Sequence, residues 1–249
     1  MQNSGMTSAK EYTEDSLFDG RIRCFQHREG YRFSVDAVLL GNFIQPKPGD
    51  RILDLGCGCG IISLILAYRW PKVSITGLEI QPDLFSLAKK NVVLNDWQER
   101  IEIVSGDLNE IGKYVEAGSF DWVVSNPPYR RPGSGRVNKG GEQAFARHEQ
   151  LADLISVTNA ADWAVKKKGK VAFIYPASRG ASVISEFKNT GLEPKKMLSV
   201  FSYPGSTASL LIIEAVKQGG EEMIILPPLY VYQEKDGEYS HEMAGYYSP

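Results

Sequence analysis

The short apolar run 51–56 ends in a turn where three glycines, Gly56, Gly58 and Gly60, alternate with cysteines. A helical pattern of apolar residues follows directly at 61–69. Glycine lets a backbone turn tightly and approach a ligand closely, because it carries no Cβ. The junction therefore predicts a strand–turn–helix unit of an α/β protein, with a ligand at the turn.

The rest of the chain repeats this alternation of strand-like and helix-like patterns. Further strands are expected at 73–80, 101–104, 120–125, 171–175, 197–201 and 209–215. Further helices are expected at 35–44, 82–95, 151–165 and 181–189. Because only a short turn with Pro204 and Gly205 joins the last two strands, they should be antiparallel. The pattern predicts a doubly wound, seven-stranded, mostly parallel sheet with one antiparallel strand.

Composition sets the class of protein. The chain has 249 residues, 28 of them basic and 30 acidic, and 43% are hydrophobic. This excludes a disordered chain and suits a single domain, with an extension and helix over 1–50, a core over 51–216 and a tail over 217–249. The apolar stretches are too short to span a bilayer, so no membrane partner is expected. Three cysteines cannot form a disulfide framework, which indicates a reduced, cytoplasmic location.

The residues around the glycine turn argue against other known loops of this kind. A dinucleotide fingerprint needs glycine where this chain has Ile61, and a P-loop needs a Gly-Lys-Ser/Thr triplet that is absent. Asp54, two residues before Gly56, suits a ligand with hydrogen-bond donors or positive charge. Cys57 and Cys59 have no further ligands at metal-like spacing, so no metal is expected and both are interpreted as small turn residues.

Acidic residues also end the next two strands. Glu79 lies about 20 residues beyond the glycine turn, where a carboxylate can accept hydrogen bonds from two ribose hydroxyls. Asp107 follows the third strand, where an acidic side chain can meet an adenine amino group. Ligands of such sheets bind at the carboxyl ends of the strands. The two acids and the glycine turn therefore indicate a nucleoside ligand.

The tetrapeptide Asn126, Pro127, Pro128 and Tyr129 ends the fourth strand and is the most specific feature of the sequence. An exocyclic amine on a base is a poor nucleophile, because its lone pair is delocalised. The Asn126 amide oxygen and the Pro127 carbonyl could both accept hydrogen bonds from its N–H groups, and the prolines would hold these acceptors in place. Tyr129 offers a flat face on which a displaced base can stack. The alternative is a merely rigid loop.

Together these motifs resemble the class I S-adenosylmethionine-dependent methyltransferases that methylate nitrogen, over roughly residues 51–216. The resemblance implies a Rossmann-like fold, with Asp54 and the glycine turn facing the methionine portion of the cofactor. It further implies that Glu79 holds the ribose, Asp107 the adenine, and the tetrapeptide Asn126 to Tyr129 the target amine.

A finer resemblance rests on residues 31–40 (YRFSVDAVLL) and 146–149 (ARHE). Both are similar to bacterial valine-tRNA adenine-N6 methyltransferases, which modify the adenine immediately 3′ of the anticodon. The resemblance implies Asp36 as a further cofactor-binding residue. Relatives that methylate guanine in rRNA or a glutamine in release factors share much of this scaffold.

A basic segment follows the tetrapeptide. Residues 130–148 hold five basic side chains and one acid, Glu142. The segment begins where a polyanionic substrate would have to arrive, so it is interpreted as a loop that contacts RNA phosphates. Its basic residues are Arg130, Arg131, Arg136, Lys139 and Arg147. Lys166, Lys167, Lys168 and Lys170 are a weaker candidate, because helix ends attract lysines for dipole reasons.

The expected function is therefore methyl transfer from S-adenosylmethionine to the N6 amine of an adenine in tRNA, at the position 3′ of the anticodon of a valine tRNA. Alternatives are methylation of guanine N2 in rRNA or of a protein glutamine. From other classes, a nicotinamide-dependent oxidoreductase and a non-catalytic RNA-binding module remain open, although Ile61 argues against the oxidoreductase. The sequence leaves the oligomeric state open.

Overall fold

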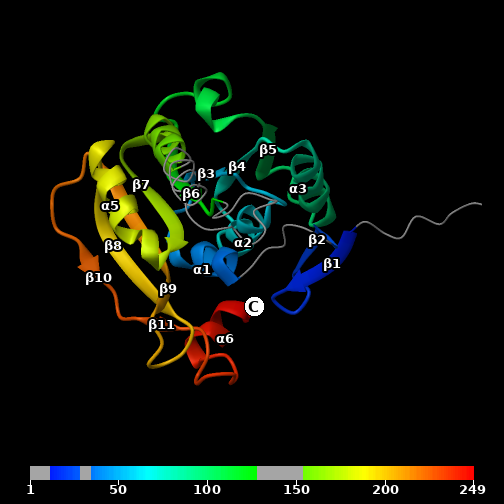
Figure 1. Cartoon of the computed structure of the whole chain (residues 1–249). Helices are drawn as coiled ribbons and strands as arrows, with labels where there is room; N and C mark the ends of the chain where they lie inside the picture. Colours follow the sequence, from blue (N-terminus) through cyan, green and yellow to red (C-terminus); the bar gives the residue numbers. More distant parts are fainter. Residues whose placement is uncertain (1–11, 29–34, 128–153) are drawn as a thin grey trace, which may run out of the picture.

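The computed structural model describes residues 12–28, 35–127 and 154–249. In these ranges the main sheet has the strand order β10-β8-β9-β7-β6-β3-β4-β5, and β11 also pairs with β8 (Figure 1). Its long strands are β3 (Arg51–Leu55), β4 (Ser74–Glu79), β5 (Ile101–Ser105), β6 (Phe120–Ser125), β7 (Val165–Pro176), β8 (Leu192–Phe201) and β9 (Ala208–Lys217).

The predicted topology is confirmed for these seven strands. Neighbours from β5 to β7 pair in parallel, and β9 runs antiparallel to both β7 and β8. Two short strands were not predicted: β10 (Ile224–Ile225) and β11 (Leu229–Tyr230), which add to the outer edge of β8 in parallel. Two-residue strands leave no alternating pattern in a sequence, which is why they escaped prediction.

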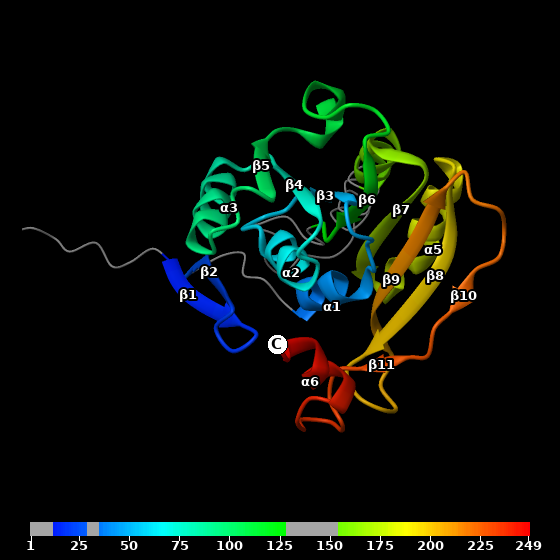
Figure 2. The ribbon, with the colours of Figure 1, turned by 180° about the vertical axis from the view of Figure 1, so that it is seen from behind.

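Helices cover both faces of the sheet (Figures 1 and 2). The helices α1 (Val35–Phe43), α2 (Ile61–Arg69), α3 (Pro82–Leu94) and α6 (His241–Tyr247) pack on one face. The helix over 154–164 and α5 (Gly180–Asn189) pack on the other. In β7 successive side chains from Val171 to Ile174 are buried alternately on the two faces, as expected for a central strand. Of the helices in the described ranges, none has the length and apolar character needed to cross a membrane.

The 3₁₀-helices were not predicted, and β7 and β8 start earlier in the chain than predicted, β8 at Leu192 rather than at 197. The segment between β5 and β6 contains only a 3₁₀-helix, η1 (Leu108–Lys113), and a second one, η2 (Ala177–Arg179), follows β7. Strand β7 starts at Val165 rather than at 171, because Val165 pairs with Phe120 before the register shifts. Lys168 lies in this irregular stretch with a φ of 63°. Lys166, Lys167 and Lys168 interrupt the apolar pattern typical of a buried strand, so the early start of β7 could not be predicted.

An N-terminal β-hairpin lies outside the main sheet, beside α3 (Figure 1). Its strands are β1 (Tyr12–Leu17) and β2 (Ile22–His27), paired antiparallel. The hairpin was not predicted, because β1 is polar at four of its six positions. Its turn packs on α2, where the Phe18 ring stacks on Tyr68 at a centroid distance of 4.8 Å.

Candidate active site

The carboxyl ends of four adjacent strands form the candidate site. Strand β3 pairs with β6 on one side and with β4 on the other, and β4 pairs with β5. Leu55 lies level with Ser125 and with Leu78, and Glu79 lies level with Ser105. The structure therefore places Asp54, Glu79, Asp107 and Asn126 at the ends of neighbouring strands, as the sequence predicted.

The glycine turn has the conformation that its residues suggested. Gly56, Gly58 and Gly60 have φ values of 69°, 59° and 85°, in the left-handed region that favours glycine. The amides of Gly56 and Cys57 both donate to the Leu78 carbonyl, at 2.9 and 3.1 Å, which fixes the turn against β4. A Cβ added at Gly56 would meet no described atom within 4 Å, so this side of the turn is open.

Glu79 is bound to the backbone around it. Its carboxylate accepts from the Gly58 amide at 2.8 Å through Oε2 and from the Gln81 amide at 2.9 Å through Oε1. The side chain is only 4% exposed. Each carboxylate oxygen can accept more than one hydrogen bond, so these contacts leave capacity for ribose hydroxyls. The acid thus holds the glycine turn in addition to lying at the expected ribose position.

Asp54 is fully buried and has one unused acceptor. Its Oδ2 accepts from the Ser63 hydroxyl at 2.7 Å, whereas Oδ1 has no hydrogen-bond partner within the described residues. Burial raises the pKa of Asp54 to about 7, against the opposing effect of the Ser63 hydrogen bonds. A buried acceptor without a donor is costly. The site therefore fits a ligand that brings a donor or a positive charge, such as S-adenosylmethionine.

The two outlying acids differ in their surroundings. Asp107 caps η1, because its Oδ1 accepts from the backbone amide and the side-chain amide of Asn109, both at 2.9 Å. It is half-buried and lies directly after β5. Asp36 is half-buried in the first turn of α1. Asp107 lies two residues after the end of β5, next to the end of β4 that carries Glu79, whereas Asp36 does not lie at a strand end.

Asn126 and Pro127 are buried directly after β6. The preceding Ser125 donates its hydroxyl hydrogen to the Leu55 carbonyl at 2.8 Å, so the end of β6 is tied to the start of the glycine turn. Two predicted members of the tetrapeptide, Pro128 and Tyr129, lie outside the described residues. The predicted RNA-contacting residues lie outside them too, namely Arg130, Arg131, Arg136, Lys139 and Arg147.

Sequence reasoning missed three side chains that support this site. Ser63 is fully buried among the apolar residues of the first turns of α2, and a small hydroxyl there was the one signal in the sequence. Asn91 of α3 is fully buried beside the glycine turn. Cys24 of β2 lies 3.9 Å from Cys59, sulfur to sulfur, and this contact raises the pKa of Cys24 and lowers that of Cys59.

Within the described ranges no group of His, Cys, Asp and Glu could hold a metal ion.

Comparison with protein families agrees with this geometry. Residues 34–151 match the family model described as "Methyltransferase small domain". Two similar proteins are both named tRNA1(Val) (adenine(37)-N6)-methyltransferase. The one from Aliivibrio salmonicida is 29% identical over 82% of this chain and 81% of its own length. The one from Haemophilus influenzae is 28% identical over 84% of this chain and 86% of its own length.

Solved structures share the fold at low sequence identity. A predicted O-methyltransferase from Agrobacterium tumefaciens superposes with a TM-score of 0.69 at 19% identity, covering 85% of this chain and 94% of the other. A geranyl diphosphate C-methyltransferase from Streptomyces coelicolor, solved with S-adenosyl-L-homocysteine, gives a TM-score of 0.50 at 11% identity, covering 73% of this chain and 78% of the other. The predicted Rossmann-like methyltransferase fold is therefore confirmed.

Proposed function

We propose that this chain, an S-adenosylmethionine-dependent methyltransferase, methylates the exocyclic N6 amine of an adenine in tRNA. The adenine is the one immediately 3′ of the anticodon of a valine tRNA. The observation that carries the proposal is the position of Asn126 and Pro127, buried beside the glycine turn through the Ser125–Leu55 hydrogen bond. The names of the similar proteins support the choice of substrate.

The cofactor would bind across the ends of β3, β4 and β5. Asp54 and the glycine turn would hold the methionine portion, because Oδ1 of Asp54 is a buried acceptor and the Gly56 side of the turn is open. Glu79 would accept from the ribose hydroxyls and Asp107 from the adenine amino group, with Asp36 as a further contact. When bound, S-adenosylmethionine supplies a methyl group on an already activated sulfonium.

The target amine would be held by the end of β6. The Asn126 amide oxygen and the Pro127 carbonyl would accept hydrogen bonds from the two N–H groups of the amine. This arrangement favours a pyramidal nitrogen, whose lone pair is then available to attack the methyl group. Both acceptors belong to a buried segment at a strand end, so they are oriented before the substrate arrives. Pro128 would keep the same backbone rigid, and Tyr129 would stack on the displaced base.

Substrate recognition would depend on the basic residues after the tetrapeptide. Arg130, Arg131, Arg136, Lys139 and Arg147 would contact tRNA phosphates close to the methylated base. A tRNA substrate also implies a cytoplasmic protein.

The test is methyl transfer to RNA from a strain that lacks this protein. Purified full-length chain and S-adenosylmethionine are added, and the nucleosides are analysed by mass spectrometry. The proposal expects N6-methyladenosine in the tRNA fraction. N2-methylguanosine in rRNA, or methylglutamine in an added protein fraction, would contradict it and support an alternative substrate. RNA binding without any methyl transfer would contradict it as well.

A further inference from the structure

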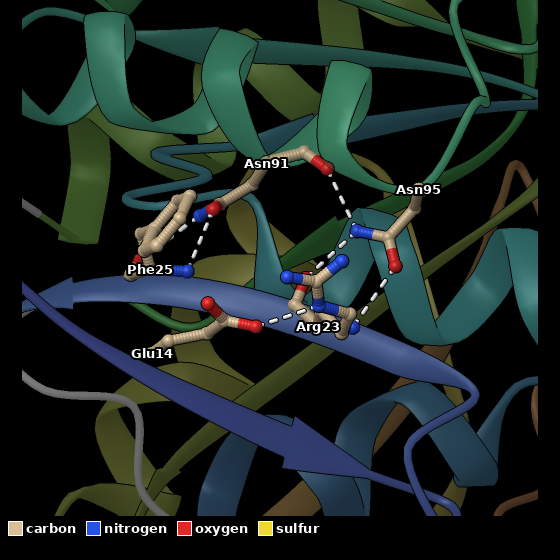
Figure 3. A network of polar contacts seen from close by, with 5 residues as sticks. All are labelled: Glu14, Arg23, Phe25, Asn91 and Asn95. Carbon is tan, nitrogen blue, oxygen red and sulfur yellow. Dashed lines mark hydrogen bonds and ion pairs between the residues drawn. The ribbon is translucent and has the colours of Figure 1, made fainter.

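The N-terminal hairpin is held against α3 by two asparagine side chains (Figure 3). Among the described residues, strand β2 pairs with β1 along one edge and with no strand along the other. Along its other edge, the amide and carbonyl of Arg23 bind Oδ1 and Nδ2 of Asn95 at 2.9 and 2.7 Å. The amide and carbonyl of Phe25 bind Oδ1 and Nδ2 of Asn91 in the same way, at 2.7 and 3.0 Å.

The spacing of the two asparagines explains this fit. Residues four apart on a helix are separated by about 6 Å along its axis, and residues two apart on a strand by about 6.6 Å. Asn91 and Asn95 can therefore offer one acceptor and one donor each to Arg23 and Phe25. Their carboxamides replace a neighbouring strand and satisfy backbone groups that an edge strand leaves open.

Asn91 makes two contacts that Asn95 does not. Its Nδ2 also donates to the Cys59 carbonyl at 2.9 Å, inside the glycine turn. The same nitrogen lies 3.3 Å from the Cys24 sulfur, and the Cys24 and Cys59 sulfurs are 3.9 Å apart. By contrast, Asn95 donates to the Asn91 carbonyl, at 2.7 Å, rather than to the glycine turn.

The glycine turn is thus held from two sides. Glu79 accepts from the Gly58 amide, on the side of β4, and Asn91 donates to the carbonyl of the next residue, Cys59, on the side of α3. Asn91 is fully buried, so water cannot replace a hydrogen bond that it loses. The orientation of the Cys59–Gly60 peptide therefore depends on a side chain that also holds the hairpin.

We propose that Asn91 is a positioning residue for the cofactor: it couples docking of the N-terminal hairpin to the conformation of the glycine turn that binds S-adenosylmethionine. The inference rests on the cofactor site proposed above. Because coupling between two equilibria is reciprocal, a bound cofactor must also stabilise the docked hairpin. The hairpin is then part of the binding machinery rather than an appendage.

The first test compares Asn91→Ala with Asn95→Ala in the full chain. Each variant loses two hydrogen bonds to the backbone of β2, but only Asn91→Ala also removes the donor to the Cys59 carbonyl and the contact with the Cys24 sulfur. Binding of S-adenosyl-L-homocysteine is measured by calorimetry. The hydrogen bonds of Asn95 to Arg23 are exposed, so water can replace them and the hairpin should stay docked in Asn95→Ala. We expect the Kd to rise at least about tenfold for Asn91→Ala and to stay within about twofold for Asn95→Ala. At saturating cofactor, kcat of Asn91→Ala should recover, so that the change lies in KM.

The second test starts with the wild-type chain, so its main outcome does not depend on a variant that folds. Cys24 lies in the hairpin and is 1% exposed, so its alkylation by iodoacetamide reports undocking of the hairpin. Saturating S-adenosyl-L-homocysteine should slow alkylation of Cys24 severalfold. In the near-isosteric Asn91→Asp variant the same ligand should protect Cys59 but no longer Cys24.

Three results would overturn the inference. They are an unchanged Cys24 alkylation rate when the wild-type chain is saturated with ligand, a wild-type Kd in a folded Asn91 variant, and an equal loss of affinity in Asn95→Ala. A wild-type chain that fails to bind S-adenosyl-L-homocysteine at all would instead contradict the cofactor site and with it the proposed function.

Discussion

The hydroxyl of Ser63 donates to Oδ2 of Asp54 at 2.7 Å and so ties the first turn of α2 to the end of β3. Both side chains are fully buried, so solvent does not screen this hydrogen bond. Burial therefore controls the pKa of the Asp54 carboxyl group. Because protonation of this group affects both folding and cofactor binding, the stability of the chain and its affinity for the cofactor should both depend on pH.

We expect the free energy of unfolding to depend on pH through Asp54. Burial raises the pKa of Asp54 from 3.8 to about 7, so the folded chain binds a proton more tightly than the unfolded chain. Stability contributed by this group is present below about pH 4 and falls as pH rises towards 7, by up to about 1.4 kcal/mol per pH unit. Denaturant unfolding of wild type and Asp54→Asn across this range should show the decline in wild type alone. Equal slopes would contradict the assignment.

The same group should make cofactor affinity depend on pH. A ligand that donates to Oδ1 or brings positive charge favours the ionised form of Asp54, so binding releases a proton below pH 7. The affinity for S-adenosyl-L-homocysteine should rise with pH and level off above about pH 7. Calorimetry in two buffers of different ionisation enthalpy measures the released protons, and Asp54→Asn should release none.

Glu79→Gln should weaken cofactor binding by about 1.5–3 kcal/mol for each charged hydrogen bond removed. The Gly58 and Gln81 amides donate to different oxygens of Glu79, and Gln has an NH2 donor in place of one of them, so one of these amides would face a donor instead of an acceptor. The exposed acid Glu102 of β5 gives a matched control, because Glu102→Gln removes the same charge outside the site. Unchanged affinity for S-adenosyl-L-homocysteine in Glu79→Gln would exclude Glu79 from the cofactor site.

Asn126→Ala should leave cofactor affinity nearly unchanged and lower the rate of methyl transfer. Loss of one preorganised acceptor commonly costs about 10²–10³ in rate. Single-turnover kinetics with saturating cofactor and RNA measures the chemical step directly. A near-normal rate in this variant would mean that another group activates the amine.

The basic residues after the tetrapeptide should contribute to RNA affinity through phosphates. The triple variant Arg130→Ala, Arg131→Ala and Arg147→Ala should bind tRNA more weakly. The dependence of log K on log salt should flatten by up to about 0.7–0.9 for each phosphate that the variant no longer binds.

A matched control removes three exposed lysines near the amino ends of β3 and β7, at the other end of these strands from the candidate site, in the triple variant Lys47→Ala, Lys167→Ala and Lys168→Ala. This control should keep the wild-type slope. If both triple variants and the wild type give parallel slopes with equal affinity, the basic segment does not touch the RNA.

Much of the site could be predicted because its chemistry is local in sequence. The glycines of the turn are required by positive φ, and Glu79, Asp107 and Asn126 each lie at the end of an apolar strand or just after it. Parallel pairing then brings these strand ends together, although their spatial order β6-β3-β4-β5 came only from the structure. The residue pattern of a strand does not show which other strands it pairs with.

The contacts that support the site could not be predicted, because they join segments far apart in the chain. Asn91 and Asn95 bind the backbone of β2, 66 and 72 residues away, and backbone partners carry no residue signature. Asn91 appeared only as a polar position on a helix with an apolar stripe. Ser63 likewise does not alter the helical pattern of α2, because a small hydroxyl is tolerated in a buried helix. The sequence also does not show that this hydroxyl donates to Asp54.

The most direct measurement of the central claim is methyl transfer to two transcripts of a valine tRNA that differ at one base. One carries adenine immediately 3′ of the anticodon and the other carries guanine there. With full-length chain and S-adenosylmethionine, we predict one N6-methyladenosine at that position of the first transcript and no methylation of the second. Equal methylation of both transcripts, or methyl transfer to guanine in the second, would contradict the account.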